Sequence, residues 1–384
     1  MAAPPISPPK YFPNVAFLDG ELSSLPETRQ QLIQSLTTIL RGSPPRKPWT
    51  DSFKKDPQGL WTGPSSIAYL FFWLSKTHPN LTIEKQLAID WCLAYLDCGS
   101  DTHPVSGNGV GVKNEFLAFN TVKAIATKDL TCVEKVRSAA ATFNTEAPAV
   151  ESEYLSGRAG TLALLRILRH WFPEASEELN QTMEPIIKHC LDNQPWKFRN
   201  VQYIGAAHGS IGIITQIILC NPRYSKELEP DLIEHLDAQR DNGNWFCRAG
   251  EPDRAELVQF CHGAPGFVFS LLKLRPHFPK LHSQIDNVIK LARQCIWEQG
   301  LLNKEPNLCH GITGNALALE SPQRDHFMSY ATAERIQAGS EDGTFVMSDD
   351  RYGLQWGEAG RAWGWMVLDI NAVEEMGWPA YTDI

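Results

Sequence analysis

One short motif occurs twice in this chain and constrains how the rest of it can fold. Residues 261–266 read Cys-His-Gly-Ala-Pro-Gly and residues 309–314 read Cys-His-Gly-Ile-Thr-Gly, 48 residues further on (309 − 261). A third copy at residues 208–212 keeps the histidine and both glycines, with Ala207 in place of the cysteine. A repeat that puts the same residues at equivalent points of successive units can bring them together on one axis. The motif therefore predicts a repeat architecture.

The glycine pair of this motif recurs in degenerate forms along the chain, and an apolar run follows it each time. The first glycines stand at positions 63, 107, 157, 209, 263, 311 and 357. Successive differences are 44, 50, 52, 54, 48 and 46 residues, and a period near 50 is the size of a helical hairpin. A glycine at a helix start lets the backbone turn sharply and neighbouring helices approach closely. We therefore expect seven hairpins, each with a buried helix after its glycines.

The segments between the motifs favour helices, and strand signals are weak. Residues 84–95 and 287–298 read as helices, and no alternating run is long enough for a sheet. The sequence predicts an all-α fold, an α/α toroid of seven helical hairpins with an inner and an outer ring. An open solenoid is the alternative, but closure is favoured because groups from repeats four, five and six must meet. Within one domain overall, we expect residues 1–50 to hold an N-terminal segment and the first outer helix, and residues 51–384 the seven repeats.

Charge and cysteine content exclude several classes of protein. The 384 residues include 35 Lys and Arg against 44 Asp and Glu, a net charge of −9, whereas binding nucleic acid or an anionic membrane needs a basic surface. Nine scattered cysteines, an odd number, are typical of reduced intracellular thiols. The N-terminus lacks the apolar core of a secretory signal, and no apolar stretch is long enough for a bilayer. We expect a cytoplasmic protein with no nucleic-acid partner and no transmembrane segment.

Four stretches of the sequence resemble one known family. They read Gly-Ala-Ala-His-Gly at 205–209, Asp-Asn-Gly-Asn-Trp at 241–245, Phe-Cys-His-Gly-Ala-Pro-Gly at 260–266 and Leu-Cys-His-Gly-Ile-Thr-Gly-Asn-Ala at 308–316. These motifs are similar to those of the lanthionine synthetase C (LanC) family, and closest to its eukaryotic LanC-like branch. The resemblance extends over all seven repeats, roughly residues 55–370. It implies an α/α toroid that holds one catalytic zinc ion.

The resemblance implies that Cys261, Cys309 and His310 bind the zinc ion. Thiolate and imidazole are ligands that zinc selects, and three protein ligands leave the fourth tetrahedral position open, as in catalytic sites. The alternative is that both cysteines are buried apolar residues, but two Cys-His pairs in the same context favour the metal. A fourth protein ligand would close the site, so we interpret His262 as a group beside the metal or facing the substrate.

Two further residues are candidates for proton transfer. His208 occupies the matching place in repeat four, and a histidine that is near zinc but not bound to it suits proton transfer near neutral pH. The resemblance gives it the general acid/base role; a hydrogen-bonded core histidine is the alternative. Glu153 stands four residues before Gly157, where the family carries an acidic residue tied to catalysis, although a helix cap is equally compatible. Arg158 either binds substrate or pairs with Glu153.

The LanC-like branch also implies a glutathione site beside the sixth motif. Lys304 matches a lysine that contacts glutathione in that branch, and a cation suits one of the two carboxylates of glutathione. The branch uses a polar loop before repeat seven as well, which is residues 346–351 here. Two of its residues are changed in this chain, where Val346 replaces an arginine and Trp356 an acidic residue, and the candidates to substitute for them are Asp349 and Arg351.

These residues predict an enzyme that activates a thiol and adds it to an electrophilic alkene. The expected reaction is zinc-dependent addition of glutathione to dehydroalanine or dehydrobutyrine in peptides or proteins, which forms a thioether. Two alternatives stay open: a zinc- and glutathione-binding adaptor without turnover, and a cyclase that joins a peptide thiol to the same peptide as a lanthionine ring. A glycosidase-like toroid would need two carboxylates that flank a cleft, and the motifs offer thiols and imidazoles instead.

Overall fold

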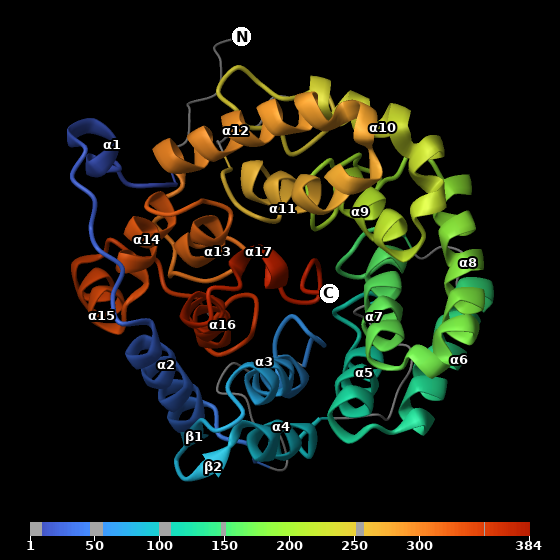
Figure 1. The fold of residues 1–384 in the computed structure, drawn as a ribbon, viewed down its shortest axis with the longest axis horizontal. Helices are drawn as coiled ribbons and strands as arrows, with labels where there is room; N and C mark the ends of the chain where they lie inside the picture. The colour runs from blue at the N-terminus through green and yellow to red at the C-terminus, as the bar shows by residue number, and fades with distance from the viewer. Residues whose placement is uncertain (1–9, 47–56, 100–108, 147–150, 251–256, 349) are drawn as a thin grey trace.

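A closed double ring of helices forms the molecule (Figure 1). The computed structural model describes residues 10–46, 57–99, 109–146, 151–250, 257–348 and 350–384. Within them, seven helices make the inner ring: α3 (Pro64–Thr77), α5 (Glu115–Thr127), α7 (Arg158–Trp171), α9 (Ser210–Cys220), α11 (Ala264–Leu274), α13 (Ile312–Leu317) and α16 (Glu358–Asp369). The all-α toroid predicted from the sequence is confirmed, and the open solenoid is excluded.

The outer ring consists of the helices that pair with these seven. In chain order they are α2 (Thr28–Gly42), α4 (Ala88–Leu96), α6 (Leu130–Glu146), α8 (Ser176–Asp192), α10 (Ser225–Asp237), α12 (His282–Gln299) and α14 (Gln323–Met328), with α15 (Ala333–Asp342) beside the last. Helix α2 packs against α16, so the first outer helix pairs with the last inner one. The ring is therefore closed by elements from opposite ends of the chain.

Short elements connect the two rings. The remaining α-helices are α1 (Val15–Asp19) and α17 (Val373–Met376), and the 3-10 helices are η1 (Pro173–Ala175), η2 (Pro222–Tyr224), η3 (Arg275–His277), η4 (Pro279–Leu281) and η5 (Ser329–Ala331). Among the described residues the single sheet is a hairpin of β1 (Thr82–Ile83) and β2 (Gln86–Leu87). None of the helices that the structure describes has the length and apolar character to cross a bilayer.

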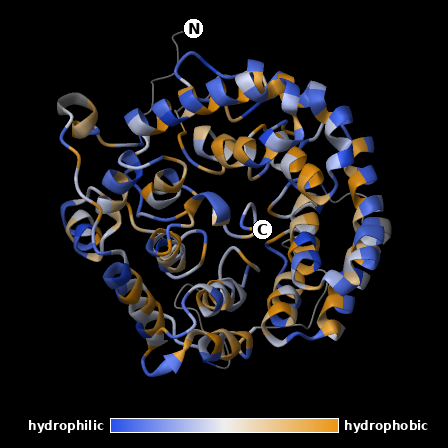
Figure 2. Ribbon diagram, in the orientation of Figure 1, coloured by the Kyte–Doolittle hydropathy of each residue, from blue (hydrophilic) through white to orange (hydrophobic). Residues whose placement is uncertain are grey.

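Burial explains why the two rings differ in composition. Helix α9 is apolar on nearly every face because it is enclosed on all sides, and ten of its eleven residues are buried. Helix α8 buries one stripe, with Leu179, Met183, Ile186 and Cys190 spaced three or four residues apart, and turns its charged face to solvent. Figure 2 shows this contrast around the ring, with more hydrophobic colour on the inner helices.

Of the two helices expected between the motifs, one lies where the sequence predicts it and the other begins later. The helix predicted at 287–298 lies within α12, as expected. The one predicted at 84–95 begins only at Ala88, because Glu84 and Lys85 take positive φ angles of 48° and 68° in the turn between β1 and β2. The apolar pattern after Ala88 was the correct helical signal, and the charged pair before it belongs to a turn.

The second repeat begins at a different residue from the one that glycine spacing predicts. Gly107 lies outside the described residues, and α5 starts later, with Asn114 as its N-cap. The Asn114 Oδ1 atom accepts a hydrogen bond from the Leu117 amide at 2.9 Å, which is the usual role of an asparagine cap. Asn114 therefore stands where the other six inner helices have a glycine N-cap.

The last residues of the chain fill the middle of the ring (Figure 1). Arg166 on α7 is buried, and its guanidinium donates to the carbonyls of Tyr381 and Ile384 at 2.8 and 2.6 Å. The Tyr69 hydroxyl of α3 donates to Asp383, and Ser270 of α11 bonds to Tyr381. These partners lie about two helical turns past the N-terminal ends of the inner helices, so the loops at those ends remain available for a site.

Candidate active site

The loops that lead into the inner helices are joined into a collar around one end of the ring. The amide of Cys261 donates to the Cys309 carbonyl at 3.5 Å, that of Cys309 to Gln355 at 2.9 Å, and that of Gln355 to Trp61 at 3.1 Å. Each contact joins residues of adjacent repeats, two positions before their helix N-caps. The next position in each repeat defines what we call the collar positions: Thr62, Lys113, Ser156, His208, His262, His310 and Trp356.

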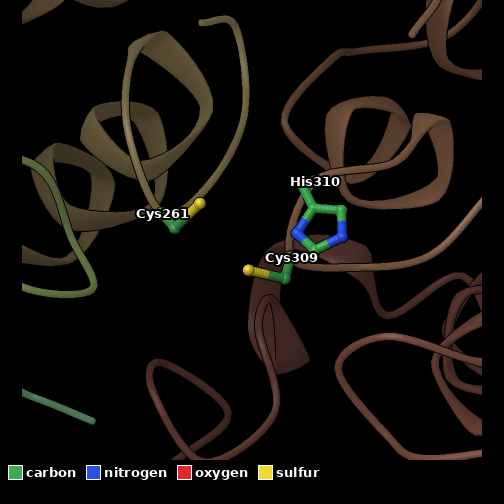
Figure 3. A group of neighbouring side chains, drawn as sticks. All are labelled: Cys261, Cys309 and His310. Atoms are coloured by element: carbon green, nitrogen blue, oxygen red, sulfur yellow. The ribbon is translucent and has the colours of Figure 1, made fainter. Parts of the chain in front are cut away.

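Two thiols and one imidazole meet on the collar (Figure 3). Cys261 and Cys309 are buried and His310 is partly exposed, and one ligand atom of each lies within 4.8 Å of the others. Figure 3 places Cys261 on one loop and Cys309 with His310 on the next. The buried Gln259 amide donates to the Cys261 sulfur at 3.0 Å, which orients it. The three residues predicted as zinc ligands are therefore brought together.

The surroundings of this cluster favour a thiolate at Cys261. The hydrogen bond with Cys309 has the largest effect and holds the pKa of the Cys261 thiol well below its usual range, and the nearby His262 and His310 lower it further. Burial raises the pKa of the Cys309 thiol. Two soft donors and one imidazole that leave a coordination position open fit a zinc ion of the catalytic type. In the described residues, no other group of three or more histidine, cysteine and acidic side chains has a spacing suited to a metal.

Local sequence explains why these loops adopt this shape. Asn307 is buried, and its Oδ1 atom accepts from the His310 amide at 3.0 Å, which forms the turn that carries both ligands of repeat six. Gly263 has a φ of 114°, and a Cβ atom there would lie 2.1 Å from the Leu257 carbonyl. A Cβ on Gly205 would lie 2.5 Å from the Cys261 carbonyl. These two motif glycines are therefore required by the backbone.

A partly exposed His208 and the buried Glu153 form a pair beside this cluster. The His208 Nδ1 atom lies 3.0 Å from the Glu153 Oε2 atom. Glu153 is only 1% exposed, and its carboxylate also accepts from the amides of Leu155 and Ser156. Glu153 therefore fixes the turn before α7 and the ring of His208, rather than capping α7, whose N-cap is Gly157.

Aromatic rings that the sequence did not single out surround His208. Phe198 stacks on the imidazole with ring centroids 4.1 Å apart and planes 9° from parallel. The ring centroid of Tyr203 lies 6.1 Å from that of His208 and 5.5 Å from that of His262, and the centroids of the two histidine rings are 6.2 Å apart. The Nδ1 atom of His262 is buried without a hydrogen-bond partner among the described residues. The His208–Glu153 pair and His262, the neighbour of Cys261, therefore share one aromatic-lined region, which the sequence indicated only by two isolated aromatic residues.

The predicted substrate-binding residues lie in different places relative to the cysteine-histidine cluster. Lys304 is partly exposed and forms a backbone bridge with Val346, and its charge acts on Cys309. Arg351 is exposed near this loop, and Asp349 lies outside the described residues. Arg158 is not brought to the cluster. Its Nε atom donates to Asn144 of the outer helix α6 at 3.2 Å, because the first residue of α7 directs its side chain toward the outer ring.

A buried ion cluster holds the loop that carries Lys304. Glu305 and Arg361 pair at 3.0 Å, and Arg361 also binds Glu358. Glu305 accepts from the Ser348 amide at 2.9 Å, so it ties the loop before repeat seven to the loop before repeat six. The two carboxylates outweigh the effect of burial and raise the pKa of Arg361. These residues position the two loops predicted to bind glutathione, and sequence reasoning did not identify them.

A double ring of helices with a cysteine-histidine cluster on the loops at one end defines a class of α/α toroid with a candidate metal centre. Residues 54–365 match the family described as lanthionine synthetase C-like protein. The chain belongs to this family. The structure of nisin cyclase resembles it with a TM-score of 0.57 over 91% of this chain and 96% of that one, at 12% sequence identity, which is a likeness of fold.

Two curated relatives match shorter parts of the chain. The LanC-like protein GCL1 of Arabidopsis thaliana is 29% identical over 189 residues, which are 45% of this chain and 42% of that protein. The glutathione S-transferase LANCL1 of Danio rerio is 27% identical over 186 residues, which are 43% of this chain and 44% of that protein. The matched part thus spans less than half the length of either relative. At the level of the family, these names support an enzyme that forms carbon–sulfur bonds.

Proposed function

We propose that this protein adds glutathione to dehydroalanine or dehydrobutyrine residues of peptides or proteins, with one zinc ion per chain. The observation that carries the proposal is the convergence of Cys261, Cys309 and His310 with the His208–Glu153 pair on one end of the ring. A soft-ligand metal position activates thiols, and a positioned imidazole moves protons. Together these are the two requirements for adding a thiol across an activated alkene.

The proposed reaction has two parts, activation of the thiol at the metal ligands and transfer of a proton by His208. A zinc ion held by Cys261, Cys309 and His310 would lower the pKa of a thiol in its open position, so that the thiolate is the nucleophile at neutral pH. The sulfur forms a bond to the β-carbon, and the alkene electrons move onto the α-carbon and its carbonyl as an enolate. A proton is then needed at the α-carbon, and the net result is transfer of the thiol proton to carbon.

His208 is the group that supplies this proton. An ionised carboxylate can only accept, so the bond to Glu153 places the hydrogen on Nδ1 and leaves Nε2 for exchange with the substrate. Glu153 also stabilises the imidazolium that forms when His208 takes the thiol proton. Phe198 restricts the ring to one plane, which preserves this geometry between the two proton transfers.

Two observations support glutathione as the thiol. The charge of Lys304 acts on Cys309, so a carboxylate of glutathione can reach this cation while its sulfur is at the metal position. The zebrafish relative is named as a glutathione transferase. The likeness of fold to nisin cyclase supports a second candidate, in which the thiol belongs to the same peptide and the product is a lanthionine ring. We place either activity in the cytoplasm, where glutathione keeps thiols reduced.

Mass spectrometry of a dehydroalanine peptide tests this proposal. The peptide is incubated with glutathione and the zinc-loaded protein, beside the Cys261→Ala variant. We expect one glutathione added per dehydroalanine, at a rate well above that of the variant. A saturable glutathione site with no adduct would instead establish the adaptor, and a rate equal to that of the variant would refute catalysis at this site. A peptide that carries both cysteine and dehydroalanine, tested without glutathione, detects the cyclase.

A further inference from the structure

One collar position holds a lysine, and the proposed function gives it no role. Of the seven collar positions, those in repeats four and six hold the proposed proton donor His208 and the proposed metal ligand His310. The equivalent residue of repeat two is Lys113, directly before the Asn114 cap of α5. Glycine spacing concealed this equivalence, because repeat two has no glycine at its N-cap.

The backbone fixes Lys113 at the collar. Its amide donates to the Leu155 carbonyl at 3.0 Å, and the carbonyl of the preceding Val112 accepts from the Leu60 amide at 2.9 Å. Repeats one and three thus hold it from both sides, as other collar positions are held by their neighbours. Lys113 is therefore a fixed part of the site and not a residue of a free loop.

Lys113 stands at the position in repeat two that His208 and His310 hold in repeats four and six, and its side chain is partly buried. Its charge interacts with Glu153, with Arg199 and with Cys309, which belong to repeat three, to the turn beside Phe198 and to repeat six. Burial is the largest influence on its pKa and lowers it, and Glu153 opposes that shift. Among the described residues, no hydrogen bond or ion pair occupies the ammonium. A partly buried cation that forms no ion pair can bind a negative charge that arrives with the substrate or develops during the reaction.

We propose that Lys113 stabilises the enolate oxygen that develops on the electrophile during thiol addition, and this inference rests on the function proposed above. As the sulfur–carbon bond forms, negative charge moves to the carbonyl oxygen next to the α-carbon. His208 protonates that α-carbon, and Lys113 shares Glu153 as an electrostatic neighbour with His208. Lys113 and His208 flank one turn, because the Lys113 amide donates to the Leu155 carbonyl and the Tyr154 amide donates to the Ala207 carbonyl, and we therefore place the oxygen on the Lys113 side. Lys304, beside Cys309, is placed for a carboxylate of the thiol instead.

Single-turnover kinetics of Lys113→Met test the role. We expect the rate of adduct formation to fall about 10²-fold, the usual loss for one oxyanion donor, with little change in the KM for glutathione. The fall should be the same with cysteamine, a thiol that has no carboxylate. Lys113→Arg should recover most of the rate. The control Lys123→Met removes a partly exposed cation that lies over Phe119 on the following helix α5, and this variant should react at the wild-type rate.

Two measurements other than turnover separate this role from a structural one. Lys113→Met should keep its zinc content, and it should bind a saturated alanyl peptide as tightly as wild type, because that peptide never becomes an enolate. Where Lys113→Met does not fold, Lys113→Gln carries the same comparison.

Several results would overturn the inference. An effect that disappears with cysteamine would assign Lys113 to the carboxylate of the thiol, and weaker binding of the alanyl peptide would make it a ground-state contact. A wild-type rate in Lys113→Met would remove it from the reaction, and loss of zinc would make it structural. Absence of adduct with the wild-type protein is a separate outcome, which refutes the proposed function itself.

Discussion

The imidazole of His208 donates from Nδ1 to the buried carboxylate of Glu153 at 3.0 Å, and the two residues come from different repeats, 55 positions apart in the chain. The pair exists because the collar holds the turn at Glu153 against the loop of repeat four, where the Tyr154 amide donates to the Ala207 carbonyl at 3.2 Å. Contact between these adjacent repeats thus creates the arrangement from which we propose that a proton is delivered.

Replacing Glu153 with glutamine should slow turnover strongly while zinc stays bound. The amide can present its NH₂ group to Nδ1 and so favour the wrong tautomer of His208, and loss of the comparable carboxylate in a catalytic triad lowers kcat about 10⁴-fold. We expect a fall between about 10² and 10⁴ in the rate of adduct formation. Glu174→Gln, at an exposed site, is the matched control. A wild-type rate in Glu153→Gln would leave the carboxylate without a catalytic role.

Cys309→Ala should lose most of its bound zinc, because two ligands cannot hold the ion as three do. The control is Cys92→Ala, which removes a fully buried thiol in the first repeat, where burial raises the pKa well above its usual value. Metal analysis after gel filtration compares the two variants with wild type. Full zinc occupancy in Cys309→Ala would show that the ion, if present, is held elsewhere.

Breaking the buried Glu305–Arg361–Glu358 cluster should lower the free energy of unfolding much more than breaking an exposed ion pair. Arg361→Met leaves two buried carboxylates without their cation, which should lower the free energy of unfolding by about 3–5 kcal/mol. Arg275→Met breaks an exposed pair with Asp286 and should change it very little. Urea denaturation measures both. Equal stabilities would mean that the buried cluster relaxes or takes up protons at little cost.

His235 on α10 predicts how stability depends on pH. Burial lowers its pKa to about 4, while its Nε2 atom bonds to Ser210 at 2.6 Å. The unfolded chain, with a pKa near 6.5, then binds more protons than the folded one, so this contribution is complete above about pH 6.5 and is lost as the pH falls toward 4. It amounts to about 3 kcal/mol. His235→Gln should flatten the unfolding free energy over that interval, and an unchanged slope would assign the acid sensitivity to other groups.

The repeat period was enough to predict the toroid, which is confirmed because a helix that starts at a glycine is visible in the local sequence. The double Cys-His motif and the family resemblance together led to the candidate metal ligands, whose role stays a prediction. The register of repeat two was missed because Asn114 replaces the glycine cap, and with it the position of Lys113. Phe198 was missed because its contact with His208 depends on how a turn folds back over the collar.

Arg158 is a residue that the sequence predicted for the site but whose side chain points away from it. It stands five residues after Glu153, but α7 begins at Arg158 after an intervening turn, and its side chain bonds to Asn144 in the outer ring. Spacing alone does not give the direction of a side chain at the first residue of a helix. Glu305 was missed for a related reason, since its partner Arg361 is 56 residues away and meets it only when repeats six and seven pack together.

The central claim is that Cys261, Cys309 and His310 hold one zinc ion and leave a position open for a thiol. X-ray absorption at the zinc edge, recorded with and without glutathione, tests it most directly. The account predicts one zinc per chain with two sulfur and two nitrogen or oxygen neighbours, and a third sulfur neighbour when glutathione is added. A protein that binds no zinc, or whose zinc neighbours do not change with glutathione, would contradict it.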